Sequence, residues 1–141
     1  MRIAFKEFNE ITGHIEHLYH EAAIKMNLSD SEMDILYILN SYNGECSQKT
    51  IYKESWLTKS TVNTALKKME RNKLILIKPS NGRNTVVSAT DKGYELIKNT
   101  TEKIIKIENE IYDSWSSEEQ KTFIELNRNF ATQLSDKIDK L

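Results

Sequence analysis

The chain has 141 residues, a formal net charge of −1 and one cysteine, and 38% of its residues are hydrophobic. It is therefore long enough to bury a hydrophobic core, and its composition argues against disorder. No apolar run approaches the ~20 residues that a membrane span needs. One proline and four glycines predict a mostly helical protein. The lone Cys46 and the absence of a secretory pattern at the start favour the bacterial cytoplasm.

The near-neutral total charge hides an uneven distribution. Residues 45–92 carry ten lysines and arginines against four aspartates and glutamates, whereas the rest of the chain carries ten against seventeen. Screening limits the reach of charge to a Debye length of ~8 Å, so a partner senses the local balance. The basic centre therefore favours contact with nucleic acid.

Two helices are predicted before this centre. The first, from Ile3 to about Met26, has a narrow apolar seam of the kind that packs against another long helix. Ser29 and Glu32 fit a capping box that opens a second helix, through about Asn40. That helix is apolar nearly all round and is predicted to be the buried spine. The seam of the first helix consists of Phe8, Ile11, Ile15, Leu18 and Ala22.

The basic centre predicts a helix, a turn and a second helix. Glu45-Cys46 is expected to form a minimal strand, and Ser47 to cap a short helix through about Ser55. After a tight turn, Thr58 caps a helix that ends near Asn72. One face of this helix is apolar, with the spacing of an amphipathic helix, and comprises Val62, Ala65, Leu66 and Met69. The opposite face comprises Ser60, Asn63, Thr64, Lys67, Lys68 and Arg71.

Two extended runs follow, residues 74–78 and 85–89, around a turn that contains Asn81-Gly82. This pattern is typical of a β-hairpin. Helix, turn, helix and hairpin together predict a winged helix-turn-helix, a module that places its second helix in the major groove of DNA.

The C-terminal part predicts two further amphipathic helices. Thr90 is expected to cap one helix of more than twenty residues that reaches Trp115, and Ser116–Glu119 to form a capping box for the last. The last helix turns inward Phe123, Leu126, Phe130, Leu134, Ile138 and Leu141. Such seams exceed what a small module can cover, so we expect a homodimer that binds a pseudo-palindromic site. The expected fold is mainly α, with a DNA-binding module at 29–97 and a helical dimerisation region at 1–28 and 98–141.

In this layout the chain resembles the MarR family of bacterial transcription regulators. Leu57–Val62 resembles the family's L-S-K-S-T-V motif, and Asn81-Gly82-Arg83 followed by Ser88–Gly93 resembles its D-x-R and L-T-x-K-G. Leu28–Glu32 and Leu66–Ile75 also match the family pattern. The resemblance implies a homodimeric repressor or activator that a small ligand, or oxidation of a thiol, releases from DNA. The sequence departs from the family pattern at Asn81, Thr64 and Trp56. These departures concern the preferred DNA sequence rather than the fold.

Three kinds of DNA contact are predicted. Arg83, at the tip of the hairpin, is expected to enter the minor groove or bind phosphate. Asn63 has the amide that pairs with adenine N6 and N7, and short neighbours on the same helix reach base edges or thymine methyl groups. Lysines and Gln48 suit contacts to the sugar–phosphate backbone. The full predicted set is Gln48, Lys49, Thr58, Lys59, Ser60, Thr61, Asn63, Thr64, Lys67, Lys68, Arg83 and Asn84.

Other sites carry weaker signals. An effector pocket is predicted from His14, His17, Tyr37, Trp56 and Trp115. A metal site on the stripe of Glu10, His14, His17 and Glu21 is physically conceivable, but histidines such as these and His20 are ordinary in a long helix without clustered cysteines, so no metal is predicted. Cys46 precedes a helix N-terminus, which suits a reactive thiol, but burial in the core is the favoured interpretation.

Competing functions are an adaptor that keeps the winged helix but binds protein, and an enzyme. The sequence alone does not exclude the protein-binding adaptor. No Gly-rich phosphate loop, no H-E-x-x-H motif and no nucleophile–base arrangement is found, so neither an enzyme nor a cofactor is predicted.

Overall fold

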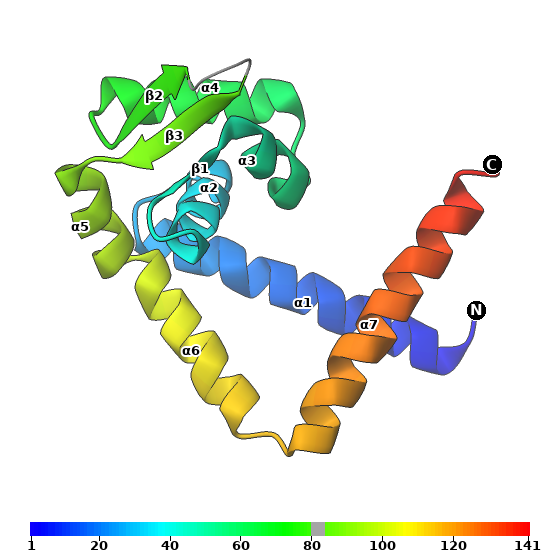
Figure 1. The fold of residues 1–141 in the computed structure, drawn as a ribbon. Coiled ribbons are helices and arrows are strands. Elements are labelled where there is room, and N and C mark those ends of the chain that lie inside the picture. Colours follow the sequence, from blue (N-terminus) through cyan, green and yellow to red (C-terminus); the bar gives the residue numbers. More distant parts are fainter. Residues whose placement is uncertain (80–83) are drawn as a thin grey trace. The chain divides into compact units, whose positions relative to one another are not determined.

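The computed structural model describes residues 1–79 and 84–141. It is mainly helical with one small antiparallel sheet (Figure 1). The chain forms two compact units, Met1–Lys103 and Ile104–Leu141. In chain order the elements are α1 (Ile3–Lys25), α2 (Asp30–Ser41), β1 (Glu45–Ser47), α3 (Gln48–Ser55), α4 (Lys59–Arg71), β2 (Ile75–Pro79), β3 (Thr85–Ala89), α5 (Asp91–Asn99), α6 (Thr101–Asp113) and α7 (Ser117–Ile138).

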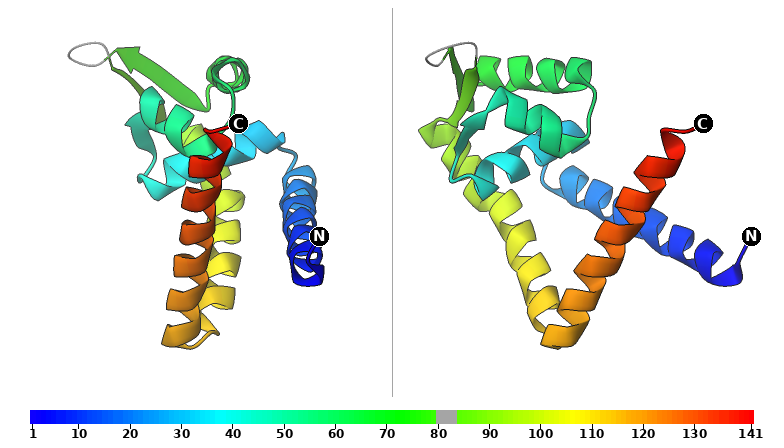
Figure 2. Two further views of the ribbon diagram at one scale, coloured as in Figure 1. Left: turned by 90° about the vertical axis from the view of Figure 1, so that its right-hand side faces the viewer. Right: turned by 45° about the vertical axis from the view of Figure 1, so that its right-hand side comes forward.

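The sheet has the strand order β1-β3-β2, with both pairings antiparallel. Val87 in the central strand faces Cys46 on one side and Ile77 on the other. The predicted minimal strand at Glu45-Cys46 is thus confirmed, as is the hairpin of β2 and β3. Both views in Figure 2 show α4 and this hairpin in one layer over α2 and α3.

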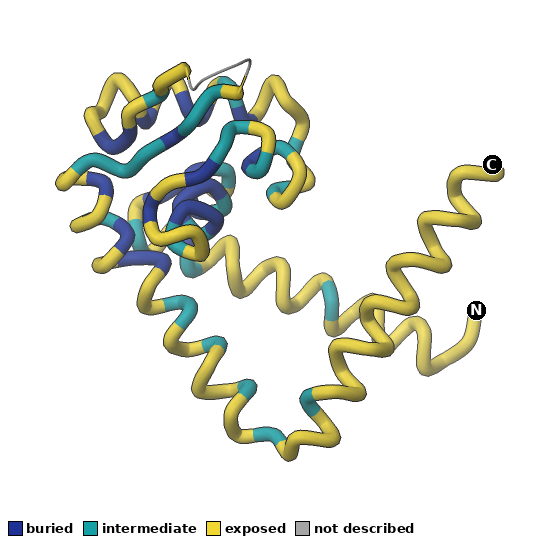
Figure 3. Tube along the Cα trace, viewed as in Figure 1, coloured by how far each residue is buried: buried dark blue, intermediate teal, exposed yellow. Residues whose placement is uncertain are grey.

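The core of the first unit lies around α2, as predicted for the spine. Ile35, Leu36 and Leu39 of α2 are fully buried, and Ile51 of α3 and Ile75 of β2 are buried beside them. The dark blue segments in Figure 3 gather on α2, α4 and the strands. The apolar face of α4 therefore completes the core, which leaves its other face to solvent.

Local capping sets where most helices begin. Each predicted N-cap side chain accepts a hydrogen bond from a backbone amide three residues later, which satisfies an otherwise unpaired N–H of the first turn. The caps are Ser29, Ser47, Thr58, Thr90 and Ser116. All five are confirmed.

The two predicted capping boxes differ. Ser116 and Glu119 form the full reciprocal pair, because the Glu119 carboxylate accepts from the Ser116 amide at 2.9 Å. At α2 only half of the box forms. The Glu32 amide donates to Ser29 Oγ at 3.1 Å, but the Glu32 carboxylate accepts instead from Ser29 Oγ and from Lys68 Nζ.

The single long helix predicted after Thr90 is wrong. The chain leaves helical geometry at Thr100, with φ −127° and ψ −90°, and this residue separates α5 from α6. The Thr100 hydroxyl donates to the Leu96 carbonyl, and the β-branched Thr101 that follows is fully buried. Side-chain bonding to a carbonyl of the preceding turn bends helices, which accounts for the break.

The long helices carry apolar side chains that remain exposed within the single chain. On α1, Ile11 and Leu18 are half exposed, and on α7 the same holds for Leu126 and Ile138. Among the described residues, none of the helices combines the length and the apolarity needed to cross a membrane.

Candidate nucleic-acid interface

The α4 helix presents a polar and cationic face to solvent. Thr58 Oγ1 accepts from the Thr61 amide at 3.2 Å and fixes where the helix begins. Val62 and Met69 are fully buried, so the helical repeat places the residues between them on the outside. The exposed residues of this helix are Lys59, Ser60, Thr61, Thr64, Lys67, Lys68, Glu70 and Arg71. Four of the five charged groups among them are cations, so the face attracts phosphate.

One of these cations already has a partner within the protein. Lys68 Nζ lies 2.7 Å from Glu32 Oε1, and the Glu32 side chain is only 9% exposed while that of Lys68 is 54% exposed. The salt bridge therefore ties α4 to α2. Lys67 and Arg71 are exposed on the same helix and suit contacts with a polyanion.

The predicted base-reading residues differ in how they are held. Thr64 Oγ1 donates to the Ser60 carbonyl at 2.9 Å, which fixes its side chain along the helix. Thr58 and Thr61 share a hydrogen bond of 2.9 Å between their hydroxyls. Ser60 is exposed at the second position of α4. Short side chains held in this way present methyl and hydroxyl groups close to the backbone.

Asn63 is not a free surface amide. It is half-buried, and its Oδ1 accepts from the Tyr52 hydroxyl and, at 3.1 Å, from Gln48 Nε2. Gln48 Nε2 also donates to the Tyr52 hydroxyl at 2.6 Å. Lys59 Nζ lies 5.6 Å from the centre of the Tyr52 ring, within reach of a cation–π attraction. Tyr52 was absent from the predicted set, although its position four residues after Gln48 places both on one side of α3.

The remaining predicted DNA contacts lie around this face. Lys49 is exposed in the first turn of α3, and Asn84 is exposed directly before β3. Arg83 lies outside the described residues.

The four predicted effector-pocket residues of the first unit come from α1, α2 and the turn before α4. His14 and His17 are exposed on α1, and His17 Nε2 lies 3.5 Å from Glu21 Oε1. Tyr37 is half-buried on α2, whereas Trp56 is 92% exposed in the turn before α4.

Trp115 belongs to the second unit. Its ring lies 5.7 Å from that of Tyr112 and 5.0 Å from that of Phe123, between centroids. These three aromatic side chains, with Gln120 Nε2 donating to the Tyr112 carbonyl at 2.8 Å, pack α6 against the start of α7. The structure thus gives Trp115 a packing role at this turn.

The thiol and the histidines are placed as follows. Cys46 is buried in the sheet, and this burial, followed by the negative charges of Glu54 and Glu45, raises its pKa to about 11. His20 Nδ1 pairs with Asp30 at 2.9 Å. Over the described part of the chain, no three His, Cys, Asp or Glu side chains are grouped so that they could hold a metal ion.

Comparison with known proteins identifies the fold. No family model matches the sequence, and no curated protein matches it. Among solved structures, AbsC, a MarR family transcriptional regulator from Streptomyces coelicolor, is 15% identical, with a TM-score of 0.76 over 94% of this chain and 93% of that one. The S. aureus MepR–DNA complex is 20% identical, with a TM-score of 0.66 over 96% and 98%. The PcaV regulator from Streptomyces coelicolor with its natural ligand is 19% identical, with a TM-score of 0.62 over 88% and 91%.

The chain therefore has the winged-helix fold of MarR-type transcriptional regulators. The fold class predicted from its motifs is confirmed by these structures together with its mainly helical architecture and small antiparallel sheet.

Proposed function

We propose that the chain is a homodimeric DNA-binding transcriptional regulator that recognises a pseudo-palindromic operator in the bacterial cytoplasm. The observation that carries the proposal is the exposed polar and cationic face of α4, opened by Thr58, in a fold shared with a regulator solved on DNA. A winged helix-turn-helix inserts this helix in the major groove, with its N-terminal residues at the base edges. The proposal assigns the chain no catalytic role.

The exposed apolar faces support the homodimer. Large side chains 36–63% exposed repeat along α1 and α7 at helical spacing, and a water-facing stripe of this length is unfavourable in a monomer. On α1 they are Phe5, Phe8, Ile11, Ile15 and Leu18, and on α7 they are Phe123, Leu126, Phe130, Leu134 and Ile138. A second copy supplies matching faces under two-fold symmetry.

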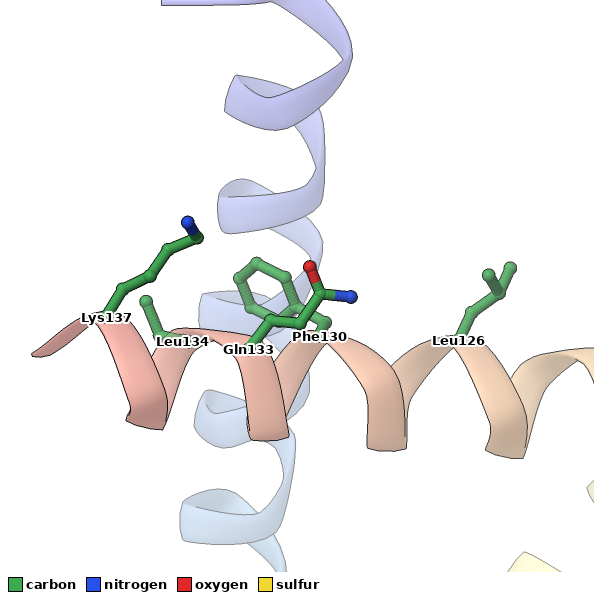
Figure 4. Close-up of a pocket in the computed structure, with 5 residues that line it drawn as sticks. All are labelled: Leu126, Phe130, Gln133, Leu134 and Lys137. Atoms are coloured by element: carbon green, nitrogen blue, oxygen red, sulfur yellow. The ribbon is translucent and has the colours of Figure 1, made fainter.

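The α7 face is also hollowed. Leu126, Phe130, Gln133, Leu134 and Lys137 project from one side of the helix around an open space of about 340 Å³ (Figure 4). Its lining is mostly apolar with a polar amide and an ammonium group at one end. Apolar side chains from a partner helix would fill such a space, so the hollow supports the assignment of α7 to the dimer interface.

We further propose repression as the mode of regulation and release by a small-molecule effector. A dimer that covers an operator blocks access of other proteins to the same DNA. A structural neighbour, PcaV, has been solved with its natural ligand, which supports a ligand-responsive dimer. The residues we assign to effector binding remain His14, His17, Tyr37, Trp56 and Trp115.

Selection from a randomised duplex library, followed by affinity measurement over a range of salt, tests the proposal. Neutralising several phosphates makes log affinity fall linearly with log salt concentration, with a slope of about −0.9 for each phosphate contact. Lys67→Glu should weaken binding to every duplex and make this slope shallower. Lys98→Glu on α5 introduces the same charge change away from α4 and should leave the slope as it is.

The adaptor hypothesis gives the opposite result. A protein-binding winged helix would select no duplex, and its association with a partner protein would tolerate Lys67→Glu. Absence of any salt-sensitive complex with duplex DNA would refute the regulator assignment.

A further inference from the structure

The internal hydrogen bonds of Asn63 decide what this residue can offer to DNA. Its Oδ1 accepts from the Tyr52 hydroxyl and from Gln48 Nε2, the latter at 3.1 Å. An amide oxygen has two lone pairs, so these two donors use its accepting capacity. The Nδ2 group keeps two hydrogens, and no residue in the described part of the chain accepts from it. Toward a ligand Asn63 is therefore a donor only.

The arrangement is held from both helices. Gln48 Nε2 donates to Tyr52 as well as to Asn63, so each member of the triad bonds both of the others. Gln48 and Tyr52 are one helical turn apart on α3, and Lys59 lies over the Tyr52 ring from α4. The orientation of the Asn63 amide is thus set before DNA binds, which lowers the entropy lost on contact.

On the premise of the DNA-binding function proposed above, we propose that Asn63 is a specificity-determining residue that selects guanine, with Tyr52 and Gln48 as its positioning residues. Bidentate pairing with adenine requires the amide oxygen to accept from N6 while Nδ2 donates to N7. In Asn63 that oxygen is occupied. Guanine presents two acceptors, O6 and N7, in the major groove, and a pure donor satisfies them without an unpaired group.

The decisive variant is Asn63→Asp. The carboxylate keeps the oxygen that Tyr52 and Gln48 bind, but it loses both donor hydrogens. The selected duplex is first compared with the same selection for Asn63→Ala, which identifies the base pair that depends on this residue. Affinities are then measured for four duplexes that differ only at that pair. Because the added negative charge weakens binding to all four duplexes alike, the ratios of one variant's four affinities cancel this general effect.

We expect the wild-type protein to favour guanine at this pair by roughly tenfold, and Asn63→Asp to lose that preference. The double variant Tyr52→Phe/Gln48→Leu removes both internal donors and frees Oδ1 to accept, so its preference should move toward adenine. Thermal unfolding of each variant shows that the fold is retained. Lys53→Ala, an exposed change on α3 outside the predicted DNA contacts, should leave the base preference unaltered.

Three results would each overturn the inference while leaving the regulator intact. The first is a wild-type preference for adenine at the Asn63-dependent pair. The second is a guanine preference that survives Asn63→Asp, and the third is an unchanged preference in the double variant. Failure of the proposed function looks different, because the wild-type protein would then form no salt-sensitive complex with any duplex, and both proposals would fall.

Discussion

Lys68 Nζ and Glu32 Oε1 lie 2.7 Å apart although 36 positions separate the two residues in the sequence. The Glu32 carboxylate is nearly buried at the start of α2, and its only cationic partner among the described residues is this lysine on α4. The bond therefore fixes the exposed helix of the module to the spine beneath it.

Removing the lysine should leave a buried charge uncompensated. We expect Lys68→Met to lower the free energy of unfolding by about 1–2 kcal/mol, below the value for a fully buried pair because Lys68 is half exposed. The double variant Glu32→Gln/Lys68→Met should recover much of that loss. Urea denaturation of the wild type, both single variants and the double variant measures the coupling, and a Lys68→Met protein as stable as wild type would contradict it.

Gly93 is required by a close approach of α5 to the start of β2. A Cβ at this position would lie 2.0 Å from the Leu74 carbonyl oxygen, which also accepts from the Thr90 amide at 3.0 Å. Because the obstacle is backbone, it cannot rotate away. Gly93→Ala should therefore destabilise the protein by at least about 2 kcal/mol, as measured by thermal or urea unfolding.

Gly13 provides the matched control. It lies on the exposed surface of α1, and a Cβ there meets nothing within 4 Å. Gly13→Ala should stabilise the helix by about 0.5–1 kcal/mol, because alanine loses less backbone entropy on folding. If Gly93→Ala and Gly13→Ala changed the free energy of unfolding equally, α5 would not pack against β2 as described.

Trp56 combines a left-handed backbone, at φ 58° and ψ 13°, with a side chain that is 92% exposed. Non-glycine residues in this conformation cost roughly 1–2 kcal/mol, while glycine loses ~0.5–1 kcal/mol more entropy on folding. Trp56→Gly should thus raise stability by about 0.5–1 kcal/mol. It should also blue-shift the tryptophan emission, since the half-buried Trp115 alone remains.

Lys73→Gly is the control for this change. Lys73 is exposed and has φ 59°, so the same gain is expected without loss of an indole ring. A clear loss of stability in Trp56→Gly alone would mean that the Trp56 ring is packed against other residues in solution.

The local signals in the sequence predicted much of this fold. Ser47 and Thr58 cap helices through atoms only three residues away, so their pattern is readable from a short segment. The Thr100 break was missed because helical periodicity continues across it; the side chain that bonds Leu96 and the burial of Thr101 depend on packing. Propensity is a weak prior wherever tertiary contacts decide.

The candidate site shows the same division. The outward face of α4 followed from spacing alone, and Lys67 and Ser60 are exposed as expected. The partners of Asn63 and Lys68 could not be predicted, because one bond crosses from α3 to α4 and the other from α2 to α4. Such bonds change the chemistry of a side chain without leaving a mark in the periodicity of its own helix.

The Cys46 thiol should react slowly. Burial, with Glu54 and Glu45 nearby, raises its pKa from 9.0 to about 11, so the reactive thiolate is scarce near neutral pH. At pH 8 its alkylation by iodoacetamide should be roughly a hundredfold slower than in the urea-unfolded chain. The folded state holds the proton more tightly, so the free energy of unfolding should fall as pH rises from 9 through 11.

Comparison with Cys46→Ala isolates this contribution from other groups that titrate at high pH. The difference in free energy of unfolding between wild type and Cys46→Ala should be constant below pH 9. Above pH 9 the wild type should lose stability relative to Cys46→Ala. Rapid alkylation of the folded protein at pH 8 would instead indicate an exposed thiolate and reopen a redox-sensing role for Cys46.

The α7 face supplies the last test, of the homodimer. Leu126 and Leu134 are 63% and 43% exposed on one side of this helix, whereas Thr132 lies on the opposite side. In a two-fold dimer each substitution acts twice, so Leu126→Glu should weaken dimerisation by roughly a thousandfold if each leucine contributes about 2 kcal/mol. Sedimentation should then show monomers that fail to bind the selected duplex, while Thr132→Glu, with the same added charge, remains dimeric. If Leu126→Glu sediments like wild type, α7 does not form the interface, and the exposed leucines need another explanation.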